Sequence, residues 1–356
     1  MRMGWQWVSG LVCVVAGLAV SGCGGRAARD GSPSPSSTTD ADAPKTGVSP
    51  VPQLEPMQTA SRCGPIMEPQ PLDNGTGSAK GTVLALRGSM LLDASVGSVI
   101  EKGWIATRDL DNSHSRLYVR GYVPGTPGAL SQSSTFAFWL DVSLPTGVQL
   151  IRFQLDGSQN QQVAWTGESS AANVVVGESL FFGGADDLLV LPQGKGKAIE
   201  VVPHTVPLVM ATDGQFVYWA DCTTTGGIQR VPVVGGAPQK IADAGCPSAL
   251  VTDGTDVFFL DPRLEPELTS NALYRVAADG GIPTRMGSFA PIVDDLALDD
   301  SSVYFGVAGS ISRIDRATGD VTEVAAVRPA PSHFVTDDHC VYFTSPSSRQ
   351  IFVVSK

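Results

Sequence analysis

Short apolar runs recur along most of the chain, separated by Gly-Gly, Asp-Gly and Asp-Asp pairs. The runs are rich in Val, Ile and aromatic residues, and long amphipathic helical patterns are missing. One unit reads VYWADCTTTGGIQRVPVVGG from Val217, and a close variant begins at Val257. Short β-rich runs bounded by turn residues are typical of strands. The pattern therefore predicts an all-β domain.

Paired aromatic residues mark a repeat. The pairs are Phe138-Trp139, Phe181-Phe182, Tyr218-Trp219, Phe258-Phe259, Tyr304-Phe305 and Tyr342-Phe343. Their spacings are 43, 37, 40, 46 and 38 residues, and each period holds four strand-like runs. A lone four-stranded meander cannot bury both of its faces, whereas radial stacking gives every sheet two neighbours. We therefore expect a β-propeller of four-stranded blades, with the aromatic pairs in its core.

The motif around Tyr218 is similar to a known repeat. Val217–Asp221, followed by the Gly235-Gly236 turn, resembles the YWTD repeat of LDL-receptor-type propellers and of related bacterial TolB-like propellers. Phe138–Asp141 and Phe258–Asp261 share the motif, whereas the other aromatic pairs lack its final Asp. The resemblance covers residues 128–356 and implies the propeller fold. Because the motif is degraded, the resemblance implies no particular ligand.

The number of blades depends on residues 82–127. Seven blades result if this segment forms a degenerate first blade, and six if it is an insertion; we expect seven. The last repeat, 330–356, has three strands, so a strand from the N-terminal side must close the ring. Residues 82–86 or the neighbouring run 89–93 are assigned to that role.

The first 23 residues are typical of an exported lipoprotein. Arg2 precedes an apolar run, Val8–Val20, that is too short to span a bilayer as a helix. The following Ser21-Gly22-Cys23 completes a resemblance to the lipobox of bacterial lipoproteins. That resemblance implies cleavage before Cys23 and its acylation by diacylglycerol and a further chain such as palmitate. The alternative is an ordinary signal peptide with an incidental cysteine.

Three segments follow from this interpretation. Residues 1–22 are expected to be the signal peptide, 23–62 a disordered Ser-, Pro- and Thr-rich tether, and 63–356 the propeller. Gly24, in place of the Asp that retains lipoproteins at the inner membrane of enteric-type bacteria, favours the outer membrane. We thus expect a protein of the bacterial cell envelope, held at the membrane by its N-terminal lipid.

Charge and cysteine usage narrow the possible functions. Without Arg2 the chain has 23 basic and 35 acidic residues, a net charge of −12, which disfavours nucleic acid as a partner. Outside the signal peptide and Cys23, four cysteines remain, which allow three pairings and suggest two disulfides in an oxidising compartment. Cys222 and Cys246 are expected on one face of the same blade, which leaves Cys63 to pair with Cys340.

Catalytic and metal-binding motifs are missing from the sequence. There is no G-x-S-x-G, H-E-x-x-H or phosphate-binding loop, and no histidine has a second histidine at ligand spacing. No cofactor or metal is therefore predicted. The Asp109–Asn112 run and the Asp299-Asp300 and Asp337-Asp338 pairs could be interpreted as calcium ligands, but recurrence in the repeats favours a turn role for the pairs.

Candidate binding residues come from features that occur once. The loops between second and third strands vary, and the longest spans 261–271. Variable loops on a rigid scaffold are a common place for binding sites. The candidate residues are Asp221, Thr223, Asp261, Arg263, Glu265 and Glu267. The expected function is a membrane-anchored binding scaffold for an envelope protein or small ligand. The alternatives are a structural component of an envelope assembly and a metal-dependent hydrolase or lyase.

Overall fold

The computed structural model describes the repeat region and parts of the segment before it. The described residues are 70–71, 80–96, 103–110, 115–121, 127–144, 147–156, 162–168, 172–223, 226–261, 271–289, 292–307, 309–327, 331–345 and 350–356. The predicted signal peptide, Cys23 and the tether lie outside them, as does Cys63, so the proposed segment boundaries stay predictions. No helix within the described ranges is long and apolar enough to cross a membrane.

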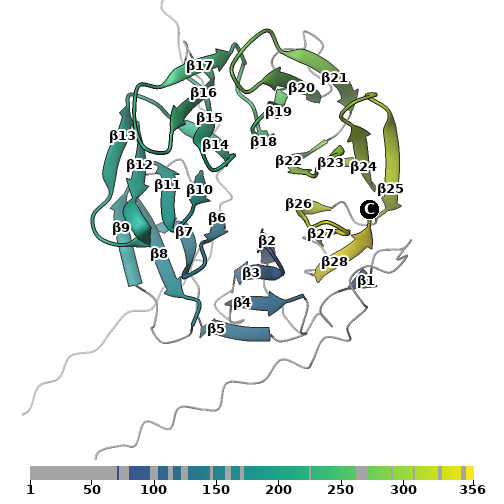
Figure 1. Cartoon of the computed structure of the whole chain (residues 1–356). Coiled ribbons are helices and arrows are strands. Elements are labelled where there is room, and N and C mark those ends of the chain that lie inside the picture. Colours follow the sequence, from purple (N-terminus) through teal and green to yellow (C-terminus); the bar gives the residue numbers. More distant parts are fainter. Residues whose placement is uncertain are drawn as a thin grey trace, which may run out of the picture. The chain divides into compact units, whose positions relative to one another are not determined.

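The described residues form seven four-stranded antiparallel sheets, which we number as blades in chain order (Figure 1). Blade 1 comprises β2 (Lys80–Arg87), β3 (Met90–Val96), β4 (Gly103–Asp109) and β5 (Ser115–Gly121). Blade 2 comprises β6 (Pro127–Gln132), β7 (Phe136–Leu144), β8 (Gly147–Gln154) and β9 (Gln162–Gly167). Blade 3 comprises β10 (Asn173–Val176), β11 (Ser179–Gly183), β12 (Asp187–Leu191) and β13 (Ile199–Pro203). A short 3-10 turn, η1 (Pro192–Gly194), lies between β12 and β13.

The remaining blades follow the repeat that the aromatic pairs mark. Blade 4 comprises β14 (Pro207–Thr212), β15 (Phe216–Asp221), β16 (Gly227–Pro232) and β17 (Gln239–Ala242), and blade 5 comprises β18 (Ala249–Thr252), β19 (Asp256–Asp261), β20 (Asn271–Ala277) and β21 (Thr284–Phe289). Blade 6 comprises β22 (Ile292–Leu298), β23 (Ser302–Val307), β24 (Ser310–Asp315) and β25 (Val321–Ala326). Blade 7 comprises β26 (Ser332–Thr336), β27 (Cys340–Ser345), β28 (Gln350–Ser355) and β1 (Gln70–Pro71).

The first strand of each blade lies innermost, and these strands form a closed ring. They contact one another in the order β2, β6, β10, β14, β18, β22, β26 and back to β2. Figure 1 shows the sheets spread outward from this centre. The prediction of a seven-bladed propeller is therefore confirmed.

The ring is closed by an N-terminal strand, but not by the one that the sequence suggested. Residues 82–86 and 89–93 lie in the first two strands of blade 1, because residues 80–121 supply all four strands of that blade. The closing strand is β1, in which Gln70 pairs with Val353 and Pro71 with Phe352 of β28. A two-residue strand that contains proline has no apolar pattern by which a sequence could reveal it.

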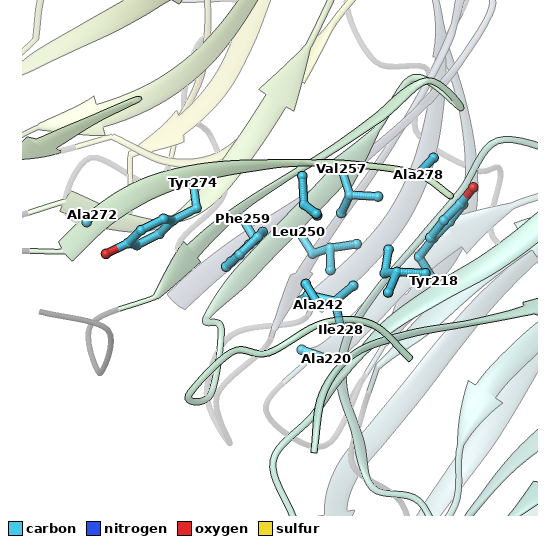
Figure 2. Packing of buried hydrophobic residues seen from close by; sticks show 12 residues of the cluster. Tyr218, Ala220, Ile228, Ala242, Leu250, Val257, Phe259, Ala272, Tyr274 and Ala278 are labelled. Atoms are coloured by element: carbon cyan, nitrogen blue, oxygen red, sulfur yellow. The ribbon is translucent and has the colours of Figure 1, made fainter. Parts of the chain in front are cut away.

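The aromatic pairs join each blade to both neighbours, because successive side chains of a strand point to opposite faces. Tyr218 packs in a cluster with Leu250 and Phe259 of blade 5 (Figure 2). Trp219, the next residue, packs in another cluster with Phe181 of blade 3. All twelve paired aromatic residues are at most 3% exposed, which confirms their predicted core role.

An aspartate organises the turn between first and second strands, here called the inner turn, in blades 4 to 7. Asp213, Asp253, Asp299 and Asp337 each accept, through Oδ1, the backbone N–H groups two and three residues later. In three of these blades Oδ2 also accepts the hydroxyl of the tyrosine five residues later, at 2.8 to 2.9 Å. The Asp pairs and Asp-Gly pairs of the sequence are thus turn residues with a specific hydrogen-bonding role.

Blade 5 has phenylalanine in place of this tyrosine, and a basic residue of the next blade substitutes for the hydroxyl. Arg316, which follows β24, forms an ion pair with Asp253 and lies 5.3 Å from the ring centre of Phe258. Lys356 of blade 7 also reaches an inner-turn aspartate of the preceding blade, with its Nζ 2.7 Å from Asp299 Oδ2, in addition to the Tyr304 hydroxyl. These contacts fasten neighbouring blades together at the inner turns.

The pKa of Asp299 provides a test of this fastening. Burial would raise the pKa, but the Lys356 ammonium, two backbone N–H groups and the Tyr304 hydroxyl together lower it from 3.8 to about 2. Because the folded-state pKa lies below the unfolded one, the resulting stability is present above pH 4 and is lost as the pH falls through about 2.

We predict that Asp299→Asn lowers the free energy of unfolding by about 2 kcal/mol at pH 7. The difference from the parent protein should shrink as the pH approaches 2, where the parent carboxylate is itself protonated. Urea denaturation at several pH values measures both effects. Asp300→Asn is the matched control, since Asp300 is exposed and only its backbone carbonyl takes part in a described hydrogen bond. Equal losses in the two variants would contradict the prediction.

Candidate functional site

The two ends of the propeller differ in their connections. The inner turns and the turns between third and fourth strands, here called outer turns, lie on one face, which we name the turn face. The loops between second and third strands share the opposite face, the loop face, with the connections from blade to blade. The candidate residues from the sequence belong to the loop face.

Two of those candidates are part of the framework. Asp221 is 6% exposed and its Oδ1 accepts the backbone N–H of Thr223 at 3.0 Å. Asp261 is fully buried and its Oδ2 accepts the backbone N–H of Gly245. Both carboxylates thus hold backbone groups of the loop face in place, and the proposed binding role of the two aspartates stays a prediction. Thr223 remains half-exposed on the loop face.

A disulfide fastens the same region of the loop face. Cys222, in the loop after β15, is bonded to Cys246, and their Cα atoms are 4.9 Å apart. Cys246 lies in the connection from blade 4 to blade 5, next to Gly245, which is held by Asp261 of blade 5. The connection is thus tied to both blades. This is the local pairing that the sequence analysis expects.

The other candidates of the long loop are not described. Arg263, Glu265 and Glu267 lie within 262–270, outside the described residues, and their proposed binding role stays a prediction. Cys340 is also disulfide-bonded. Its partner lies outside the described residues, so the pairing with Cys63 stays a prediction as well.

A groove of about 380 Å³ lies between the outer part of blade 2 and blade 3. Trp165 of β9 forms one wall, and its indole packs edge-on against Phe182 with ring centres 5.1 Å apart. A side chain at position 167 would collide with the indole, which explains the glycine there. Polar side chains complete the groove; they are Glu168, Asp186, Asp187 and Lys197.

The groove is predominantly acidic. Burial, followed by the charges of Glu200 and Asp186, raises the pKa of Asp187. His204 lies beside the groove, with Nδ1 3.2 Å from Asp186 Oδ2, and both side chains are largely exposed. The carboxylates and the half-exposed Trp165 give this groove the chemistry of a polar-ligand site with one aromatic wall.

A second pocket, of about 520 Å³, opens on the turn face between blades 4 and 5. Its lining joins the inner turns of both blades to the outer turn of blade 5 through Asp213, Gln215, Phe216, Tyr218, Arg230, Asp253, Gly254, Thr255, Asp256, Ala277, Ala278 and Asp279. We call it the seam pocket.

Arg230 spans the seam pocket from blade 4 to blade 5. Its guanidinium lies 4.5 Å from the ring centre of Phe216, and Nη1 donates to the carbonyl of Ala278 at 2.6 Å. Nε and Nη2 donate to Gln239 Oε1 at 3.1 and 3.0 Å. These contacts hold Arg230 in place within the protein.

Tyr218 also lines the seam pocket. Burial and the hydrogen bond to Asp213 raise the pKa of its hydroxyl to about 12.

The histidines give no metal site among the described residues. His333 of β26 faces Asp295 of β22 with 3.8 Å between Nδ1 and Oδ2, and burial raises the pKa of that aspartate. Throughout the described ranges, no three His, Cys, Asp or Glu side chains are placed to hold a metal ion. The sequence did not indicate either pocket, because each is made by residues of two blades.

Solved structures share this architecture at low sequence identity. An oligogalacturonate lyase from Vibrio parahaemolyticus superposes with a TM-score of 0.58 at 13% identity, over 80% of this chain and 92% of its own. Hydrazine synthase of Kuenenia stuttgartiensis gives 0.58 at 14% identity, over 78% and 96%. BamB from Moraxella catarrhalis gives 0.51 at 11% identity, over 78% and 84%.

These likenesses define the class: the domain is a β-propeller. At such identities they show the fold alone, because one propeller scaffold hosts many unrelated functions. No protein-family model and no curated protein matches the sequence.

We predict that replacing both cysteines of the loop-face disulfide, as Cys222→Ser with Cys246→Ser, lowers the free energy of unfolding by about 3 kcal/mol. The chain-entropy model gives this value for a loop of this length, 24 residues in sequence separation. Denaturation of the oxidised parent and the double variant measures the difference. An unchanged unfolding midpoint would show that the bond constrains nothing.

We also predict that Cys340 is bonded to Cys63. Peptide mapping of the purified protein under non-reducing conditions should yield one peptide pair that joins these two residues. A Cys340 peptide joined to any other cysteine would overturn the prediction.

Proposed function

We propose that this protein is a lipid-anchored propeller of the bacterial envelope that binds a partner or ligand. The structural observation that supports binding is the presence of two pockets at blade seams, each lined by side chains from two blades. Pockets at such junctions, in a rigid frame, are a usual place for ligands. The lipobox-like Val20–Cys23 supports the anchor.

Rigidity is the property of the frame that suits it to binding. The inner-turn aspartates, Arg316 and Lys356 hold neighbouring blades in fixed positions, and the Cys222–Cys246 bond fixes one connection. A ligand that meets two blades therefore finds its contacts already arranged, which reduces the entropy lost on binding. The fold neighbours include a lyase, but fold alone does not decide between binding and catalysis.

Site-specific photocrosslinking in intact cells tests the binding role. A photoreactive residue at Gln215, exposed at the seam pocket, should give a discrete adduct. The same residue at Thr322, exposed on the outer strand β25, should give none. Equal labelling from both positions, or none from Gln215 and none from Asp187 in the other groove, would contradict a binding role for the two pockets.

We predict that Cys23→Ser releases the protein from the membrane. Several acyl chains, at ~0.8 kcal/mol per buried CH₂, hold an otherwise water-exposed domain at a bilayer. Cell fractionation should find the parent protein in the membrane pellet and the variant in the supernatant. Cys13→Ser is the control, because Cys13 lies inside the predicted signal peptide. Retention of the Cys23 variant in the pellet would contradict the anchor.

A further inference from the structure

Four blades have an inner-turn aspartate. In two of them, a basic residue of the next blade forms an ion pair with that aspartate across the seam. Asp253 of blade 5 pairs with Arg316 of blade 6. Asp299 of blade 6 pairs with Lys356 of blade 7. In both cases the cation comes from the residue that follows the third strand of the next blade. The two ion pairs therefore occupy equivalent positions at successive seams.

Ala278 occupies the same repeat position in blade 5. Its backbone N–H donates to an inner-turn carbonyl of its own blade, Thr255 O, at 2.8 Å. The backbone N–H groups of Arg316 and Lys356 do the same, toward Ser301 O and His339 O. The backbone carbonyl groups at this position also have equivalent partners. Arg230 of blade 4 donates to Ala278 O, and Arg275 of blade 5 donates to Arg316 O.

Asp213 therefore lacks the cation that two other inner-turn aspartates receive. Its Oδ1 accepts two backbone N–H groups and its Oδ2 accepts the Tyr218 hydroxyl at 2.9 Å. Among the residues that the structure describes, Asp213 has no ion-pair partner. Figure 2 shows Ala278 at the same end of the packed cluster as Tyr218. The methyl group of Ala278 is too short to reach the carboxylate, and the seam pocket remains beside it.

At two other seams a side chain lies near the corresponding place. Between blades 7 and 1 the position belongs to Leu110, which packs against the cluster that contains Tyr342. Between blades 2 and 3, Lys195 lies 5.5 Å from the ring centre of Phe136. Lys195 follows Gly194, whose carbonyl accepts from Arg152. At the seam pocket the residue after the accepting carbonyl is Asp279, exposed and of opposite charge.

We propose that the seam pocket receives a guanidinium or ammonium group from a ligand, at the place that Arg316 and Lys356 fill in the next two seams. Asp213 is its carboxylate partner, and Asp279 adds negative charge at the rim. Charge-assisted hydrogen bonds between a guanidinium and a carboxylate are strong and directional. This inference rests on the proposed binding function and gives one of its two pockets a ligand chemistry.

The source of the cation is the side chain of a basic polypeptide. Two aliphatic side chains stand at the outer turns of the same two blades, Val234 at 97% exposed and Ile282 at 91%. Gly281 N donates to Ile241 O at 2.9 Å, which fixes the outer turn of blade 5 against the outer strand of blade 4. A peptide with apolar residues beside its arginine or lysine would use both features, whereas a small amine would use only the pocket.

Binding to a short peptide and to its neutral isostere tests the proposal. The probes are acetyl-Ile-Arg-Ile-amide, the same peptide with citrulline in place of arginine, and acetyl-arginine-amide. Calorimetry with the purified full-length protein in detergent should show the arginine peptide binding at least about tenfold more tightly than the citrulline peptide. It should also bind more tightly than acetyl-arginine-amide. If the citrulline peptide binds as tightly as the arginine peptide, the proposal is wrong. It is also wrong if acetyl-arginine-amide binds as tightly, because the ligand would then be a small cation and not a polypeptide.

Two variants locate the site. Ala278→Arg supplies the missing cation from within the chain, and Asp213→Asn removes the carboxylate's charge; each should weaken the arginine peptide by about tenfold or more. Thr322→Arg adds the same charge on the exposed outer strand β25 and should leave binding unchanged. Unchanged binding in both pocket variants would overturn the assignment.

A stability measurement keeps the test independent of folding defects. If the guanidinium of Ala278→Arg pairs with Asp213, this variant should unfold at a temperature no lower than the parent. The double variant with Asp213→Asn should lose that stability. If Ala278→Arg fails to fold, Asp213→Asn and the citrulline comparison still decide the outcome. Membrane release by Cys23→Ser is measured separately, so failure of the anchor and failure of the pocket cannot be confused.

Discussion

The hydrogen-bonded aspartate of the inner turn is the contact on which the packing of the later blades depends. In blade 4, one oxygen of Asp213 fixes the turn and the other fixes the hydroxyl of Tyr218. The ring of Tyr218 is in turn part of the cluster shared with blade 5. Turn geometry, ring position and blade-to-blade packing are thus coupled through a single carboxylate. Where the hydroxyl is absent, at Phe258, the neighbouring blade supplies Arg316.

Much of this fold could be predicted from the sequence, because the repeated features are local. The aromatic pairs give the period, and the two-residue alternation of a strand explains why two bulky residues are needed per blade. The Asp-Gly and Asp-Asp turns are readable for the same reason. The closing strand could not be found, since Gln70 and Pro71 have no pattern of their own and are defined only by their pairing with β28.

The site was less predictable, because it depends on which residues meet across a seam. Asp221 and Asp261 have the sequence character of loop residues, and only the structure shows that both are buried and accept backbone hydrogen bonds. The seam pocket lies beside a small residue, Ala278, at a position where blades 6, 7 and 1 have Arg316, Lys356 and Leu110. A single alanine carries no signal in one sequence. Its meaning comes from alignment with Arg316 and Lys356, which the strand register provides.

The short closing strand has a consequence for the order of events during biogenesis. A chain is synthesised from its N-terminal end, so Gln70 and Pro71 are made before the other strands that the structure describes. Their partner, β28, is the last strand of the chain. Almost the entire propeller must therefore be synthesised before β1 can pair with β28, and pairing between segments so far apart in sequence is intrinsically slow. During that interval β1 has no partner strand, and its backbone groups are open to pairing with other strands. Ring closure therefore requires that β1 be kept free of other partners until β28 is present.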